Sequence, residues 1–234
     1  MNNEGVNLIN DTYAFHRILK TDIKKDPDVE EDEIIFGCGC FWGAEKCFWK
    51  LPGVVTTSVG YAGGEKNNPN YYEVCSGLTG HSEVVRIIWD RREIDVSDLL
   101  KMFWECHDPT QKNRQGNDMG TQYRSAIYYK NENNIKTIIA SKDQYQKELN
   151  KKNIGLIETE IKKIDSYFYA EQYHQQYLAS AGSRQYCSAS PTKVKLGSFT
   201  GSNYKLKSYI WENFNWEVDK CVLRSDNNPI QNNN

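Results

Sequence analysis

The sequence predicts one α+β domain with a ferredoxin-like, split βαβ core, in which an antiparallel or mixed sheet has helices packed on it. Three observations predict this fold. Apolar strand-like runs and helical periodicities follow one another in the order β-α-β-β-α-β, and glycine and proline separate them. The length of 234 residues suits one sizeable domain with long, partly irregular extensions at both ends.

The first half of this order occupies residues 33–89. Residues 33–36 are predicted as a short strand, and residues 42–51 as a helix that Pro52 and Gly53 end. A second strand covers residues 54–61. After a loop rich in Asn, Gly and Pro, residues 82–89 are predicted as the third strand.

The second half begins with a helix from an N-cap at Ser97 to about residue 105, followed by a strand over residues 122–129. Three elements come after this core. The spacing of apolar residues predicts an amphipathic helix over residues 135–149, a more polar edge strand over 157–164 and a short helix over 171–179.

The ends of the chain differ from the middle. We divide the sequence into an N-terminal extension, residues 1–32, a catalytic domain, residues 33–190, and a C-terminal extension, residues 191–234. An aromatic cluster in the last of these is expected to pack on the domain. The stretch 182–201 suits a mobile loop, and the polar tail from Asn227 is expected to be disordered.

Composition excludes several classes of protein. A formal net charge of -2 and a pI near 6.1 give no electrostatic surface for nucleic acid or for an anionic membrane. No apolar run approaches the ~20 residues of a membrane span. The start lacks the pattern of a signal peptide, and the acid-rich stretch 22–33 is unlike a transit peptide. We therefore expect a cytoplasmic protein, and a monomer.

The strongest chemical feature is a cysteine at the start of a helix. Cys40 stands in the run Gly39-Cys40-Phe41-Trp42-Gly43, where the apolar strand ends and the helix begins. The free N–H groups and the positive dipole end of a helix stabilise an anion. We therefore predict that Cys40 is ionised near neutral pH and acts as a nucleophile.

The other cysteines have simpler interpretations. Seven is an odd number, and a chain of this size does not need disulfides to fold. Cys47 shares a helical stripe with Ala44, Phe48 and Leu51, which predicts a core position. Cys106 ends an apolar helix and is interpreted in the same way.

Glu83 is a candidate proton donor. In the third predicted strand it shares a face with Val85, Ile87 and Trp89, while Arg86 points to the other side. A carboxyl on an apolar face is poorly solvated, which raises its pKa and keeps it protonated. The alternative is that Glu83 reaches water at the strand end.

Two tyrosines follow loops near this strand. Tyr71 lies in the loop before Cys75, and Tyr123 opens the fourth predicted strand. Phenol hydroxyls can hold a substrate oxygen without adding charge. Because the chain has 15 tyrosines, the alternative for each is a half-buried packing role.

The run at residues 39–43 resembles the active-site motif of the methionine sulfoxide reductase A family, the peptide-methionine (S)-S-oxide reductases. The resemblance continues in order through GYAGG at 60–64, EVCSG at 73–77, TGHSE at 79–83, FWECHDP at 103–109, QGNDMGTQYRS at 115–125 and AEQYHQQYL at 170–178. Ordered blocks from residue 34 to about 190 are far more specific than one five-residue motif.

The resemblance implies a reaction and its residues. The enzyme would reduce methionine-S-sulfoxide in proteins and peptides, and free methionine sulfoxide, without a cofactor. Cys40 would attack the sulfoxide sulfur, Glu83 would protonate the oxygen, and Tyr71 and Tyr123 would hold that oxygen. The resemblance places the substrate pocket at Phe41, Trp42 and Asp118.

The resemblance also implies how the enzyme is recycled. Attack would leave Cys40 as a sulfenic acid, which a second thiol converts to a disulfide. Cys187 matches the recycling cysteine of the family, and thioredoxin would reduce the disulfide. Cys221 lies outside the matched region and could be a second recycling thiol. Cys38 departs from the pattern and is either an inert thiol or a competitor for the sulfenic acid.

Two other classes of function stay open. The first is a hydrolase or transferase in which Cys40 works with His81 or His107 as base. Either histidine could instead be structural, His107 as a cap of the preceding helix. The second is a thiol-metal module of Cys38, Cys40, Cys47 and Cys75, for which the usual paired zinc spacing is missing.

Overall fold

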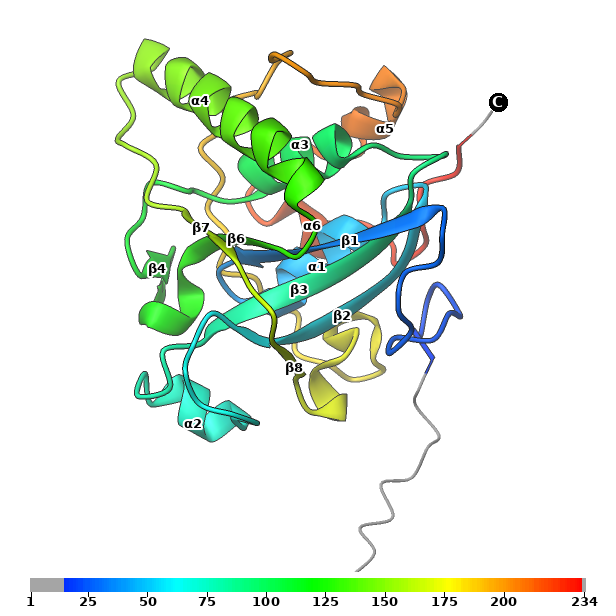
Figure 1. Cartoon of the computed structure of the whole chain (residues 1–234), viewed down its shortest axis with the longest axis vertical. Coiled ribbons are helices and arrows are strands. Elements are labelled where there is room, and N and C mark those ends of the chain that lie inside the picture. Colours follow the sequence, from blue (N-terminus) through cyan, green and yellow to red (C-terminus); the bar gives the residue numbers. More distant parts are fainter. Residues whose placement is uncertain (1–14, 233–234) are drawn as a thin grey trace, which may run out of the picture.

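The structure, a computed structural model, describes residues 15–232. Figure 1 shows the arrangement of its elements. The strands are β1 (Glu31–Cys38), β2 (Val54–Ala62), β3 (Ser82–Asp90), β4 (Arg114–Gln115), β5 (Asp118–Met119), β6 (Ser125–Tyr129), β7 (Glu160–Lys163) and β8 (Tyr167–Tyr169). The helices are α1 (Phe41–Trp49), α2 (Tyr71–Cys75), α3 (Val96–Cys106), α4 (Ile135–Lys151), α5 (Ser208–Glu212) and α6 (Cys221–Arg224).

The main sheet has the strand order β7-β6-β1-β3-β2-β8. Its central part, β6-β1-β3-β2, is antiparallel throughout, and the two connections through α1 and α3 give it the split βαβ arrangement. At the edges, β7 is parallel to β6 and β8 is antiparallel to β2. The predicted α+β fold with a mixed sheet is confirmed.

The core lies between this sheet and the helices α1 and α3, and in Figure 1 α1 is behind the strands and α3 is above them. Phe36 of β1 packs against Phe48 of α1 and Phe103 of α3, with ring centroids 5.3 and 4.8 Å away. Burial of one such side chain contributes roughly 1.5–3 kcal/mol. The predicted core positions Cys47 and Cys106 are both buried here.

The opposite face of the sheet has a smaller apolar cluster that includes Ile35, Val84 and Tyr128. Residues 164–166 join β7 at one edge to β8 at the other, so this part of the chain crosses that face, in front of the sheet in Figure 1. Ile164 and Tyr167 thereby cover the smaller cluster.

Three predicted elements differ from the structure. The N-cap of α3 is Asp95, not Ser97, because Asp95 and Asp98 form a capping box. The strand predicted from residue 122 begins at Ser125, after a 3-10 turn over Thr121–Tyr123. The helix predicted over residues 171–179 is two 3-10 turns, Gln172–His174 and Tyr177–Ala179.

The interruption of the helix predicted over residues 171–179 has a visible cause. Gln176 lies between the two turns with a φ of 47°. Its backbone N–H and its side-chain amide both donate hydrogen bonds to the buried carboxyl of Glu45, over 2.8 and 2.7 Å. These contacts favour the interrupted conformation over a continuous helix.

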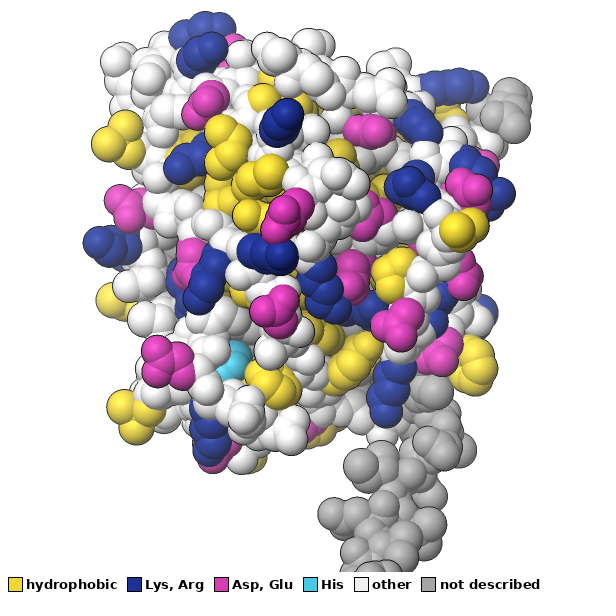
Figure 2. Space-filling view, viewed as in Figure 1, with side chains coloured by type: hydrophobic (Ala, Val, Ile, Leu, Met, Phe, Trp, Pro, Cys, Tyr) yellow, Lys and Arg dark blue, Asp and Glu magenta, His cyan; other side chains and the backbone are white. Residues whose placement is uncertain are grey.

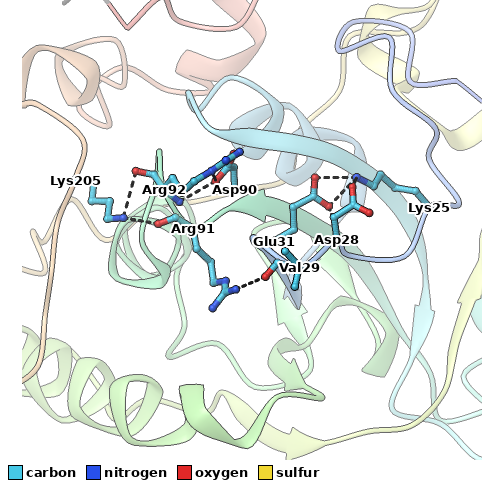
Figure 3. Close-up of polar contacts among 8 residues, drawn as sticks. All are labelled: Lys25, Asp28, Val29, Glu31, Asp90, Arg91, Arg92 and Lys205. Carbon is cyan, nitrogen blue, oxygen red and sulfur yellow. Dashed lines mark hydrogen bonds and ion pairs between the residues drawn. The ribbon is translucent and has the colours of Figure 1, made fainter.

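Segments from both ends of the chain meet at the turn after β3 (Figure 3). The Arg91 guanidinium donates to the carbonyl of Val29, and the Lys205 ammonium donates to the carbonyl of Arg91. Nearby, Lys25 pairs with Glu31 over 2.7 Å. Figure 2 shows that the surface on this side mixes basic and acidic side chains.

The C-terminal extension packs on the domain. Ile210, Phe214, Trp216 and Val222 are buried in the main core. Residues 182–201 contain no helix or strand, yet they are not the loose loop that the sequence suggests, since Leu196 is fully buried.

Of the tail predicted to be disordered, residues 227–232 are described and contact the domain, whereas residues 233–234 lie outside the described residues. The Trp49 indole N–H donates to the carbonyl of Asn227, and the Lys50 ammonium donates to the carbonyl of Asn228. The N–H of Ile230 donates in turn to the carbonyl of Lys50. Within residues 15–232, no helix has both the length and the apolar character needed to cross a bilayer.

Candidate active site

One cavity of about 310 Å³ gathers the residues predicted for the first chemical step and for substrate binding, whereas Cys187 lines a different crevice. It is lined by Cys40, Phe41, Trp42, Tyr71, Glu83, Asp118, Tyr123, Tyr177, Arg184 and Tyr186. The first seven residues of this list, from Cys40 to Tyr123, are the ones predicted from the sequence for the first chemical step and the substrate pocket. They come from five separate parts of the chain, which the fold brings together.

Cys40 is the N-cap of α1, directly after the turn at Gly39. Gly39 has a φ of 84°, and a Cβ at this position would lie 2.5 Å from the Cβ of Gln115. A side chain is therefore excluded at residue 39 by both conformation and space. This turn places the Cys40 thiol at the helix N-terminus and in the wall of the cavity.

Glu83 lies on β3 beside the start of α1. The backbone N–H of Phe41 donates a hydrogen bond to its carboxyl over 3.1 Å. The side chain is buried, so the alternative in which Glu83 reaches water is wrong. Burial raises the pKa of Glu83 to about 8, against the opposing effect of the Phe41 hydrogen bond. The carboxyl is therefore mostly protonated at neutral pH, as the sequence predicts.

The predicted resting thiolate is not supported. Burial and then the nearby Glu83 raise the pKa of Cys40 well above its ordinary value, while a hydrogen bond from the Trp42 backbone lowers it. The helix N-terminus thus acts in the expected direction, but desolvation outweighs it. Cys40 is a thiol at rest, and its proton must leave during the reaction.

The two tyrosines stay protonated donors. Burial raises the pKa of both Tyr71 and Tyr123 above the ordinary value of a phenol. Glu171 holds the first of them in place, because its carboxylate accepts hydrogen bonds from the Tyr71 backbone N–H and from the Tyr61 hydroxyl, both over 2.8 Å.

The apolar wall of the cavity is a set of stacked rings. The Trp42 ring stacks on Tyr177, with centroids 3.8 Å apart, and its indole N–H donates to His174 Nδ1 over 3.0 Å. The ring of Phe41 lies 5.2 Å from His174. The sequence analysis gives no role to His174 or Tyr177, although both lie in the AEQYHQQYL block that it matches.

Asp118 has a partner that the sequence does not reveal. The Tyr186 hydroxyl donates a hydrogen bond to its carboxylate over 2.5 Å. Arg184 lies over the Tyr186 ring, 5.4 Å from the centroid. The segment that carries Cys187 therefore closes one side of the cavity, and Cys187 itself follows Tyr186 directly.

Cys187 faces a second, neighbouring crevice on the other side of this segment. That crevice is also lined by Cys38, Cys47, Cys106 and Cys221. Burial raises the pKa of Cys187 to about 12. Its sulfur touches the backbone of α1, because a Cβ on Gly43 would lie 2.5 Å from Sγ of Cys187.

The histidines of the alternative function lie elsewhere. His107 Nδ1 donates to the carbonyl of Phe103, and its Nε2 is 2.7 Å from the Ser125 hydroxyl. Burial lowers the pKa of His107 to about 4. His81 is buried at the start of β3, against Phe168. Neither ring is among the side chains that line the cavity of Cys40 in the described part of the chain.

Residues that could hold a metal are also outside this cavity. In residues 15–232, the closely grouped ligands are the sulfurs of Cys38 and Cys106 and a ring nitrogen of His107. Of the four cysteines predicted for a thiol-metal module, only Cys38 belongs to this group, and Cys40, Cys47 and Cys75 do not.

Comparisons with known proteins agree with this site. The family model for peptide methionine sulfoxide reductase matches residues 32–206. A peptide methionine sulfoxide reductase MsrA from Vibrio vulnificus (strain CMCP6) is 52% identical over 179 residues, which cover 76% of this chain and 85% of that protein. An MsrA from Azotobacter vinelandii is 55% identical over 164 residues, 70% of this chain and 76% of that protein.

Two solved structures have the same fold. Methionine sulfoxide reductase A of Corynebacterium diphtheriae superposes with a TM-score of 0.67 at 40% identity, over 78% of this chain and 88% of that one. Reduced Mxr1 from Saccharomyces cerevisiae gives 0.62 at 32% identity, over 70% and 92%. By these matches, the chain belongs to the peptide methionine sulfoxide reductase family.

Proposed function

We propose that this protein reduces methionine-S-sulfoxide in proteins and peptides, and free methionine sulfoxide, to methionine. The observation that carries the proposal is one cavity that joins a cysteine thiol, a buried protonated carboxyl and two phenols to an apolar wall. A sulfoxide needs each of these: a nucleophile for its sulfur, a proton for its oxygen and an apolar surface for its methyl group.

In the first step, the S-methyl group lies against Phe41 and Trp42, and the oxygen lies among Glu83, Tyr71 and Tyr123. Glu83 donates its proton to the oxygen, which makes the sulfur electrophilic enough for attack by Cys40. The carboxylate of Glu83 that this leaves accepts the thiol proton. The sum is transfer of one oxygen from substrate to enzyme, so methionine leaves and Cys40 becomes a sulfenic acid.

In the second step, the thiol of Cys187 attacks the sulfenic sulfur of Cys40, and water leaves as a disulfide forms. Sγ of Cys187 lies against α1 at Gly43, about one helical turn from Cys40, and lines the neighbouring crevice, so its segment would have to turn toward Cys40. The hydrogen bond between Tyr186 and Asp118 must open for this movement.

An external dithiol then reduces the disulfide, and we propose thioredoxin for this role. Cys221 lies in the same crevice as Cys187 and is half-buried, so it is placed to pass the disulfide outward. If mass spectrometry after one turnover never finds Cys221 oxidised, this relay is wrong.

All seven cysteines are free in the structure, which fits the reducing cytoplasm that we propose as the location.

The test is an assay of each sulfoxide epimer in a peptide, with thioredoxin or a small dithiol as reductant. Cys40→Ser should form no methionine. Cys187→Ser should form one equivalent per enzyme and then stop with thioredoxin. Cys75→Ser is the matched control, because the Cys75 thiol lines neither cavity and a serine hydroxyl can keep its hydrogen bond with Tyr71, and this variant should still recycle with thioredoxin. Activity only on the other epimer, or full activity of Cys40→Ser, would refute the proposal.

A further inference from the structure

Three thiols meet inside the domain, away from Cys40. They are Cys38 at the end of β1, Cys47 on α1 and Cys106 at the end of α3, and we call them the thiol cluster. The sulfurs of Cys38 and Cys106 lie within 4.8 Å of each other. The Cys106 thiol interacts with both of the others, and all three residues are buried.

The thiol cluster lines the inner part of the crevice that holds Cys187. The crevice has a free volume of about 20 Å³, enough for one particle of the size of a water molecule. Cys221, which is half-buried, and Lys220, whose residue is exposed, are also in its lining. The partly exposed Cys221 and the buried thiol cluster therefore line the same crevice.

The surroundings of these sulfurs select the kind of ligand. Soft thiolates favour soft ions, among them Cu(I) and Zn(II). Zinc usually takes four ligands, and the nearest candidate for a fourth is His107. Its Nδ1 proton is already donated to the Phe103 carbonyl over 2.7 Å, and its Nε2 faces Ser125. One His107 nitrogen lies within 4.8 Å of both sulfurs, but both ring nitrogens already have partners, so an ion that accepts two sulfur ligands fits this site better than zinc.

We propose that the thiol cluster is a binding site for one cuprous ion. Metal–sulfur bonds of about 2.3 Å place two sulfurs on a common ion roughly 3.8–4.6 Å apart, and the sulfurs of Cys38 and Cys106 lie within 4.8 Å of each other. These two thiols bind as thiolates and release two protons. The Cys47 thiol contacts Cys106 but lies outside the group of ligand atoms within 4.8 Å, so it lies beside the ion and is not required as a ligand. Copper enters and stays as Cu(I), so no electron is transferred.

The charge of the complex is balanced by its surroundings. One Cu(I) and two thiolates leave a net charge of -1 in the crevice. Lys220 lines the same crevice, and the buried Lys46 is next to Cys47 on α1. Both ammonium groups reduce the cost of placing this charge away from water.

One consequence rests on the proposed function. Since Cys187 lies in the same crevice, an ion held by the cluster would block the movement of its thiol toward Cys40. Copper should therefore slow recycling and leave the first turnover intact.

The test measures binding directly and needs no sulfoxide. The reduced protein, as the Cys40→Ser variant, is titrated without oxygen with Cu(I) buffered by a chromophoric chelator, and the stoichiometry and affinity are read from the chelator. We expect one ion per chain. Replacing Cys38 or Cys106 with Ala should weaken binding at least tenfold, whereas Cys75→Ala and the Cys187→Ala/Cys221→Ala double variant should retain it.

X-ray absorption at the copper edge is measured on the protein with all cluster cysteines in place. Its result therefore does not depend on whether a variant folds. A shell of two or three sulfurs in the protein with all cluster cysteines supports the site. Failure to bind one ion, loss of binding in the Cys187/Cys221 double variant, or nitrogen in the shell would overturn it. A protein that binds copper in this way but leaves sulfoxide unreduced would refute the proposed function alone.

Discussion

Replacement of Glu83 by Gln separates the proton donor from the shape of the site. Gln keeps an oxygen that can accept the hydrogen bond from the Phe41 N–H, which spans 3.1 Å in the structure. It has no proton to donate to the substrate. General acid catalysis contributes about 10²–10⁴ in rate, so the first turnover should slow by that factor.

The pH dependence of the first turnover provides a second expected magnitude. With a pKa of about 8, about nine-tenths of Glu83 is protonated at pH 7 and about one-tenth at pH 9. The rate constant of the first turnover in the wild type should therefore fall about tenfold between these pH values. The Gln variant has no proton to lose at this position, so its slow rate should not show this decrease.

The same group makes stability depend on pH. The unfolded carboxyl titrates near 4.5, and the folded one near 8, so the folded state binds the proton more tightly. The free energy of unfolding is thus reduced as pH rises from about 4.5 to 8, by roughly 3 kcal/mol at pH 7. Glu83→Gln removes this titration. The free energy of unfolding of the variant, compared with that of the wild type, should therefore rise as the pH increases over that range.

The assays are single-turnover reduction of a peptide sulfoxide without reductant, from pH 6 to 9, and urea unfolding at pH 5 and 8. Two results would refute the role of Glu83. One is a variant rate within a factor of ten of the wild type. The other is a stability difference between the two proteins that is the same at pH 5 and pH 8.

Three further predictions concern neighbouring residues. Gly43→Ala would put a Cβ 2.5 Å from Sγ of Cys187, so disulfide formation should change while the first turnover stays within about twofold, as quenched-flow thiol counts would show. Tyr177→Ala removes the ring stacked on Trp42, so KM for a peptide sulfoxide should rise by about tenfold, or about 1.4 kcal/mol, in steady-state assays. His107→Asn should lower the free energy of unfolding by about 1–3 kcal/mol and leave the first turnover nearly unchanged, whereas a Cys-His hydrolase would lose it.

The sequence predicts the core elements well because their signals are local. The period-two pattern around Glu83 correctly places Val85, Ile87 and Trp89 on the core side of β3. On the opposite side, Arg86 meets Glu33 over 2.6 Å. Motif blocks that are far apart in the sequence meet in one cavity because β1, α1 and β3 are neighbours in this fold.

The errors arise where distant groups decide the local structure. The asparagine-rich tail looks disordered by composition, but the indole of Trp49 and the ammonium of Lys50 donate hydrogen bonds to its carbonyls. Likewise, the buried carboxyl of Glu45 interrupts a predicted helix at Gln176. No pattern within either segment shows these partners, so composition and periodicity alone could not predict them.

The charge state of Cys40 shows the same limit at the active site. The helix N-terminus and its N–H groups can be read from the sequence, and they do favour a thiolate. Burial cannot be read so easily, and here it outweighs them. Glu83 is held neutral by the same burial, so a thiol and an acid lie together in one cavity without charge. The bound substrate changes this charge state. Once its oxygen takes the proton of Glu83, the carboxylate that remains can accept the proton of the Cys40 thiol. An enzyme built in this way keeps Cys40 unreactive until a sulfoxide is bound.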